Sequence, residues 1–180
     1  MFSLAATGYT YPHMTLTSHA ITGAAVATLA PQNPALAFAF GFLSHFLLDA
    51  FPHGHYRLLS HTSHPEDRLK EDMIYGRAFV FDLLKIGVDV SLGAVLAYFL
   101  FMTGDNPKAV AIAFGALGGV LPDALQFVYW KIRREPLISL QKFHIGVHAT
   151  KKFDGNARKT ALVEIATIVI AILFVQFTSL

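Results

Sequence analysis

Residues 78–102 read AFVFDLLKIGVDVSLGAVLAYFLFM, a long apolar run that contains three charged side chains, Asp82, Lys85 and Asp89. A membrane-spanning helix needs about 20 predominantly apolar residues, so this run is long enough to cross a bilayer. Residues 109–130 and 160–178 are two further runs of the same kind. The sequence therefore predicts an integral membrane protein built from helices.

Two shorter apolar segments, residues 17–30 and 35–51, precede these runs. They are short for a span, so each could cross with little tilt, cross where the bilayer thins, or contribute to a half-buried hairpin. The PQNP sequence at 31–34 predicts a turn between them, because proline removes a donor and disfavours helix at the preceding residue. We expect an all-α bundle of about five transmembrane helices that forms one domain over residues 1–180.

Composition agrees with a membrane domain and excludes several functional classes. The 180 residues are 54% hydrophobic and 14% charged, and the mean hydropathy is +0.49, which is too apolar for an ordinary soluble domain of this length. The chain has no cysteine, which excludes disulfides, thiolate metal sites and iron–sulfur clusters. It also lacks the motifs of nucleotide hydrolases, serine esterases and standard zinc proteases.

The basic residues are distributed unevenly between the expected loops. Strict alternation of five spans puts the long loops 52–77 and 131–159 on the same face as the N-terminus. These loops carry twelve Lys and Arg residues, and the opposite face carries only Lys108. The positive-inside rule therefore predicts that the N-terminus and both long loops are cytoplasmic. A basic surface that faces anionic lipid would show the same pattern without changing the topology.

Histidines and aspartates gather in three motifs, SHFLLDAFPHGHY at 44–56, GGVLPDALQ at 118–126 and FHIGVHAT at 143–150. An Asp near the middle of a spanning helix costs about 2.5–3.5 kcal/mol, so such residues normally mark a functional site. Because His and Asp are ligands for zinc and related metals, we predict a metal centre near the cytoplasmic side. The candidate metal ligands are His19, His45, Asp49, His53, Asp123, His144 and His148.

Spacing within two of these motifs suits chelation. His45 and Asp49 are four residues apart, as are His144 and His148, so on a helix each pair would project from one face and bind one ion. A solvated surface pair is the alternative for His144 and His148. That alternative does not suit His45 and Asp49, because both lie inside an apolar run.

Two other carboxylates are candidates for catalytic roles, Asp123 and Asp89. Asp123 follows Pro122 and two glycines, where a kinked helix could aim a carboxylate inward, although a local cap would use the same residue. Asp89 is either a ligand or a carboxylate that orients a metal-bound histidine. Lys85 lies between Asp82 and Asp89 at helical spacing, so a structural ion-pair ladder is the alternative there.

These motifs resemble a known family. GFLSHFLLDAFPH and GGVLPDALQ are similar to segments of the bacterial membrane-bound metal-dependent hydrolases of the YdjM-like family, and the Ser18-His19 segment and the His144/His148 pair are similar to two others. The spacing of His45, Asp49 and His53 also resembles the metal-binding helix of zinc phospholipase C. The resemblance implies a metal-dependent hydrolase in a prokaryotic inner membrane, with a phospholipid or another phosphoester as substrate.

We therefore expect an integral-membrane hydrolase that holds one to three zinc ions, with manganese or iron as alternative metals. Membrane lipid is the expected partner, nucleic acid is not expected, and assembly into an oligomer stays open. The alternative function is a non-catalytic structural or assembly subunit of a membrane complex that binds metal or haem. Haem would need histidine axial ligands, and the interleaved aspartates argue against it.

Overall fold

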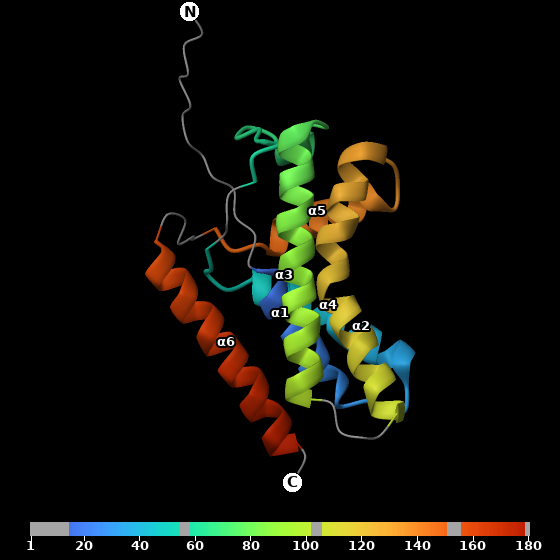
Figure 1. Ribbon diagram of the computed structural model, residues 1–180. Helices are drawn as coiled ribbons and strands as arrows, with labels where there is room; N and C mark the ends of the chain where they lie inside the picture. The colour runs from blue at the N-terminus through green and yellow to red at the C-terminus, as the bar shows by residue number, and fades with distance from the viewer. Residues whose placement is uncertain (1–14, 55–57, 102–105, 151–155, 179–180) are drawn as a thin grey trace, which may run out of the picture.

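The computed structural model describes residues 15–54, 58–101, 106–150 and 156–178, and these form an almost entirely helical bundle (Figure 1). The helices are α1 Leu16–Ala27, α2 Pro34–Asp49, α3 Arg77–Phe101, α4 Asn106–Ile132, α5 Leu137–Val147 and α6 Ala157–Thr178. The remaining elements are the 3-10 turn Arg68–Lys70 and the antiparallel strands β1 His61–Thr62 and β2 Asp72–Met73. The predicted all-α class is confirmed.

Three helices are long and apolar enough to cross a membrane: the segments Arg77–Phe101, Lys108–Ile132 and Arg158–Thr178. They coincide with the three long runs of the sequence. The 12 residues of α1 and the 16 residues of α2 make shorter helices. At 1.5 Å per residue these reach only about 18 and 24 Å, less than the ~30 Å hydrocarbon core. A crossing by α1 or α2, and with it the five-span topology, stays a prediction.

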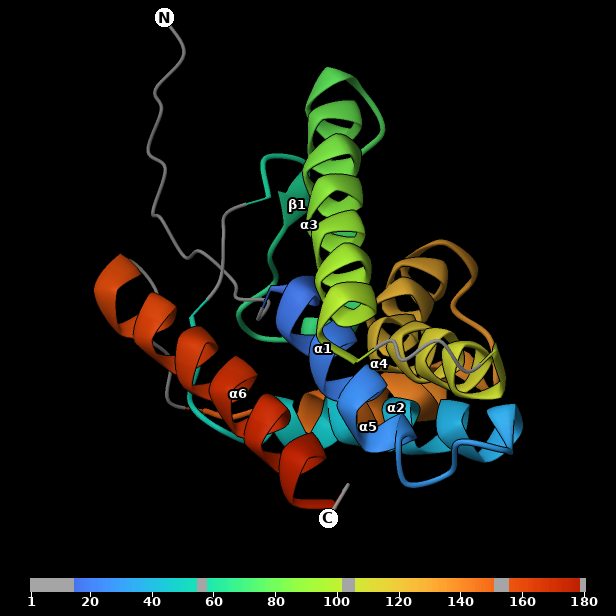
Figure 2. The ribbon, with the colours of Figure 1, turned by 60° about the horizontal axis from the view of Figure 1, so that its bottom comes forward.

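The short helix α1 lies at the centre of the bundle, with α2, α3, α4 and α6 around it (Figure 2). Its buried side chains Ile21, Ala24 and Ala25 form one cluster with Ala97 and Phe101 of α3, and the cluster also includes Ile112 of α4 and Ala171 of α6. A helix buried on most sides needs no polar face. This explains why α1 is rich in small residues and has no Asp, Glu, Lys or Arg, although it carries His19.

Glycines let α1 and α2 approach α4 very closely. A Cβ placed on Gly119 of α4 would collide with the backbone oxygen of His19, and one placed on Gly41 of α2 would collide with the backbone of Gly115. Small residues at helix contacts are the usual means of close packing in membranes. The result is that His19 of α1 and His45 of α2 both lie against the same stretch of α4.

The N-terminus of α1 meets the middle of α3 rather than one of its ends. Asp89, halfway along α3, accepts hydrogen bonds from the backbone nitrogens of Leu16 (2.7 Å) and Thr17 (3.2 Å) and from the hydroxyl of Thr17 (2.7 Å). A carboxylate at this place satisfies unpaired N–H groups of the first turn and interacts favourably with the helix dipole. The contact fixes the start of α1 at the mid-level of α3.

The segment expected as the second long loop contains a helix, α5, which packs against α2 and α4. Gln141 and His144 are its buried residues. The backbone N–H of Ala149, just beyond the helix, donates to the backbone oxygen of Asp49 at 2.7 Å. This bond ties the end of α5 to the end of α2, where the candidate site lies.

Candidate metal centre

The structure brings together all seven predicted metal ligands. His19 comes from α1, His45 and Asp49 from α2, and Asp123 from α4, while His53 follows α2. His144 comes from α5, and His148 caps its C-terminus. Their ligand atoms form three overlapping groups in which all atoms lie within 4.8 Å of one another: His19/His45/Asp49, His45/Asp123/His144 and Asp49/His53/His148.

Asp49 lies at the centre of the cluster, and its two oxygens face different histidines. Oδ1 is 3.4 Å from Nε2 of His19 and 3.9 Å from Nε2 of His53. Oδ2 is 3.2 Å from Nε2 of His45 and 2.7 Å from Nε2 of His144. Each oxygen of Asp49 therefore has its own pair of histidine nitrogens beside it, and Asp49 with these histidines would hold any metal ion bound here.

Backbone carbonyls set the tautomers of two of the histidines. Nδ1 of His45 lies 2.8 Å from the carbonyl oxygen of Gly119, and Nδ1 of His53 lies 2.6 Å from that of Phe51. A carbonyl only accepts, so Nδ1 carries the proton in each neutral ring and leaves the Nε2 lone pair toward Asp49. Metal-bound histidines commonly use their second nitrogen in this way.

The side chains of His45, Asp49 and Asp123 face one another and require positive charge between them. In the neutral ring, Nε2 of His45 presents a lone pair to Oδ2 of Asp49 and, at 3.6 Å, to Oδ1 of Asp123. It also lies 3.3 Å from Nε2 of His144. Lone pairs at these distances repel unless a proton or a metal cation lies between them. A divalent cation would satisfy several of these atoms at once.

The need for positive charge is greater because the histidines are buried. His19 is 1% exposed and His45 is fully buried, and their rings stack at a centroid distance of 4.1 Å. Nδ1 of His19 has no hydrogen-bond partner among the residues that the structure describes, and Nε2 faces only the Oδ1 of Asp49 at 3.4 Å. A buried polar atom with so little compensation is costly, and a bound cation at Nε2 would offset part of that cost. The donor set of imidazoles and carboxylates fits zinc, manganese or iron.

No protein-family model matches the chain, and comparison with curated proteins and with solved structures finds no significant match. The resemblance to the YdjM-like hydrolases stays a prediction from the motifs. The functional assignment must therefore come from the geometry of the site.

Asp89, the second predicted catalytic carboxylate, lies outside this cluster. Both of its oxygens accept hydrogen bonds from the first turn of α1, so its contact with the centre is indirect, through the helix that carries His19. Asp82 has a similar architectural role, since its oxygens accept from the backbone nitrogens of Leu59 and Ser60. These hydrogen bonds account for the positions of Asp82 and Asp89 without the ion-pair ladder through Lys85.

The centre lies beside the middle of α3 and α4. Helix α1 begins beside Asp89 at the middle of α3, His19 is one turn further along α1, and His45 contacts Gly119 at the middle of α4. This position arises because α1 and α2 are short and bring their ligand-bearing ends to the middle of the longer helices. The position of the centre near the cytoplasmic side of a membrane stays a prediction.

Two contributors to the site could not be found from residue types. The carbonyl groups of Gly119 and Phe51 orient the histidines, but any residue could supply a carbonyl. Gly119 carried a weak signal, because it lies in the GGVLPD motif. Phe51 carried none.

Proposed function

We propose that this protein is a membrane-embedded, metal-dependent hydrolase that cleaves a phosphoester. The observation that carries the proposal is the convergence of five histidines and two aspartates around Asp49 in a largely apolar bundle. Ionisable groups at such depth are expensive and usually functional. Imidazole and carboxylate groups are the donors that hold zinc and related metals in hydrolases, and this donor set supports the proposal.

The number of donors supports two ions. Zinc in proteins takes about four ligands, and fewer protein ligands at catalytic sites, where one position is kept for water. Seven protein donors exceed that number. His19 and His53 lie beside Oδ1 of Asp49, whereas His45 and His144 lie beside Oδ2. We therefore propose a pair of ions, with zinc as the preferred metal and Asp49 shared between them.

Metal ions held by such ligands activate water as a nucleophile and polarise a phosphoryl oxygen. In the proposed reaction, Asp123 accepts a proton from the attacking water, the water oxygen forms a bond to phosphorus, and the bond from phosphorus to the leaving oxygen breaks. The leaving oxygen then takes up the proton that Asp123 accepted. The Asp123 side chain is 14% exposed, more than that of Asp49 at 4%, and its Oδ1 lies 3.8 Å from Nε2 of His144.

The surroundings suit a phosphate-bearing substrate. The segments 52–77 and 131–159, which flank the ligands in sequence, hold twelve of the fourteen Lys and Arg residues. Such basic segments attract the phosphates of lipid headgroups at a membrane surface. A phospholipid or another phosphoester is therefore the proposed substrate class.

Metal analysis of the purified protein, together with an activity assay, tests this proposal. The Asp49→Asn variant should lose most of its metal, and chelation should abolish hydrolysis of a chromogenic phosphodiester until zinc or manganese is restored. Asp123→Asn should lose activity while the protein stays folded. Asp67→Asn is the matched control, because Asp67 is an exposed loop carboxylate whose pKa is lowered by its hydrogen bond to Lys70.

Three results would contradict the proposal. Full metal occupancy in Asp49→Asn would remove the assigned centre. A metal-loaded protein that is inactive on a broad panel of phosphoesters, esters and amides would favour the structural-subunit alternative. A haem absorption band in the purified protein would favour the alternative of a haem-binding subunit of a membrane complex.

A further inference from the structure

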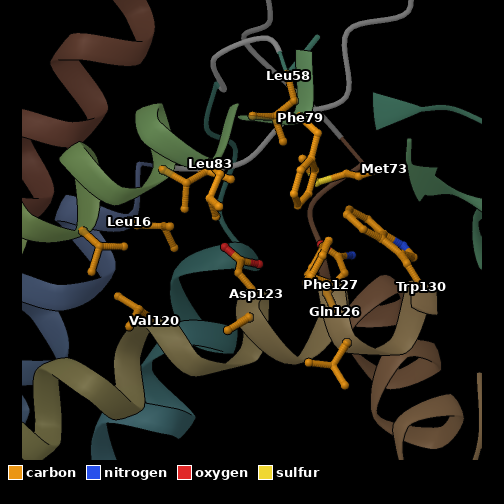
Figure 3. Close-up of a pocket in the computed structure, with 14 residues that line it drawn as sticks. Leu16, Leu58, Met73, Phe79, Leu83, Val120, Asp123, Gln126, Phe127 and Trp130 are labelled. Carbon is orange, nitrogen blue, oxygen red and sulfur yellow. The ribbon is translucent and has the colours of Figure 1, made fainter. Parts of the chain in front are cut away.

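An apolar cavity of about 430 Å³ lies between α3 and α4, and Asp123 projects into it (Figure 3). Leu83 and Phe79 of α3 lie on one side, and Phe127 and Trp130 of α4 lie on the other. Among the described residues, Asp123 is the one charged side chain that lines the cavity. The cavity therefore has largely apolar walls, one amide, that of Gln126, and a single carboxylate that also belongs to the metal centre.

A second apolar cavity, of about 510 Å³, continues along the same pair of helices. Val90 of α3 and Val120 of α4 line both cavities, so the two cavities adjoin at these residues. Val120 lies one turn of α4 before Asp123. Leu16 and Ala20 of α1 contribute to the lining. We call the two cavities together the α3–α4 groove.

The groove opens where bilayer hydrocarbon would surround the protein. Both of its walls belong to helices that are long and apolar enough to cross a membrane. Leu83 lines the first cavity and is 55% exposed, and Leu117 lines the second and is 51% exposed. A molecule in the bilayer could therefore reach the groove from the side, without passing through water.

We propose that the α3–α4 groove binds the hydrocarbon chain of a membrane lipid whose phosphoester headgroup lies at Asp123. This rests on the proposed function, because Asp123 is where the groove meets the metal centre. The cavity volumes fall within the range of about 300–1,000 Å³ that small-molecule sites occupy. A lipid chain that moves from the bilayer into the groove exchanges one hydrocarbon environment for another. The groove therefore fixes the position of the lipid and adds little hydrophobic binding energy.

A helix from a second copy of the chain is the competing occupant. It would cover the exposed part of the Asp123 carboxylate, 14% of that side chain, with apolar side chains and offer it no polar partner, which is costly. A lipid has an apolar chain and a polar headgroup, and it matches a groove that is apolar along its length and charged at one point. The lining therefore favours a lipid.

Photolabelling tests the site without requiring turnover. The full-length protein is reconstituted in nanodiscs that contain a phospholipid with a diazirine group on its acyl chain, and the labelled peptides are identified after irradiation. We expect labels to concentrate on the groove-facing residues of α3 and α4. Labels spread evenly over the lipid-facing helices, including α6, would overturn the proposal.

Two variants fill the groove at a distance from the metal ligands. Ala113→Trp on α4 and Ala94→Trp on α3 introduce indoles at exposed alanines that line the second cavity. Each should lower groove labelling about tenfold, within the range expected for overpacking a fitted site. Ala166→Trp, at an exposed position of α6, is the matched control and should not change the labelling. Unchanged labelling in both groove variants would refute the assignment.

The outcomes separate this inference from the proposed hydrolysis. Labels confined to the groove in a protein that hydrolyses nothing would support lipid binding and remove the enzymatic proposal. In an active protein, the groove variants should lower hydrolysis of long-chain phospholipid more than that of the chromogenic phosphodiester. An equal loss on both substrates, or an efficient disulfide between copies through Ala113→Cys, would overturn the lipid assignment.

Discussion

Replacing Asp89 should destabilise the protein while leaving its metal ligands in place. The carboxylate accepts two backbone hydrogen bonds and one hydroxyl hydrogen bond at the start of α1, with lengths of 2.7, 3.2 and 2.7 Å. Leu16 and Thr17, the residues that donate them, are 6% and 7% exposed. Water therefore has little access to these N–H groups when the carboxylate is removed.

The expected cost follows from these contacts. An unsatisfied buried donor costs about 1–3 kcal/mol, and loss of an N-terminal cap alone costs about 0.5–2 kcal/mol. For Asp89→Ala, with two N–H groups left unpaired, we expect a loss of about 3 kcal/mol in the free energy of unfolding. Asp89→Asn keeps one acceptor oxygen, so about half of that loss is expected. At roughly 2–4 °C per kcal/mol for a chain of this size, Asp89→Ala should melt about 6–12 °C lower.

Thermal unfolding in detergent and elemental analysis of the same samples test this reasoning. Asp89→Asn should keep its metal at low temperature, and Asp49→Asn should lose it. If Asp89→Asn lost the metal with an unchanged melting temperature, Asp89 would be a ligand, as one reading of the sequence allowed. The assignment of this carboxylate to the start of α1 would then be refuted.

Three further predictions concern packing and topology. Gly119→Ala forces a methyl group against the backbone of His19 and should cost about 1–3 kcal/mol, so a melting temperature equal to wild type would contradict the close approach of α1 and α4. Asp82→Ala leaves the backbone nitrogens that it binds unpaired and should cost about 2–4 kcal/mol without metal loss, as calorimetry and elemental analysis would show. Single cysteines at Glu66 and Lys108, both exposed, should react with an impermeant reagent from opposite sides of the membrane, with Glu66 cytoplasmic. Labelling of both from one side would contradict the topology.

The sequence by itself determined the helical membrane class and the position of the long helices. Hydrophobic length is a local property, so residues 78–102, 109–130 and 160–178 predicted α3, α4 and α6 to within a few residues. The His45/Asp49 pair was visible for the same reason, because two ionisable residues one turn apart in an apolar run need no tertiary contact to be noticed. Helix α5 was missed, because 11 residues of mixed polarity carry a weak periodic signal.

Only the tertiary structure decided which polar residues share the site. His144 lies 95 positions from Asp49, and their approach to 2.7 Å depends on how α5 folds back onto α2. Asp89 and Asp123 are both aspartates in apolar helices, and the sequence made both of them candidates for catalytic roles. One faces the first turn of α1 and the other faces His45 and the α3–α4 groove. Their roles differ because a side chain's neighbours are set by helix packing, which a single sequence encodes only through the combined shape of all its helices.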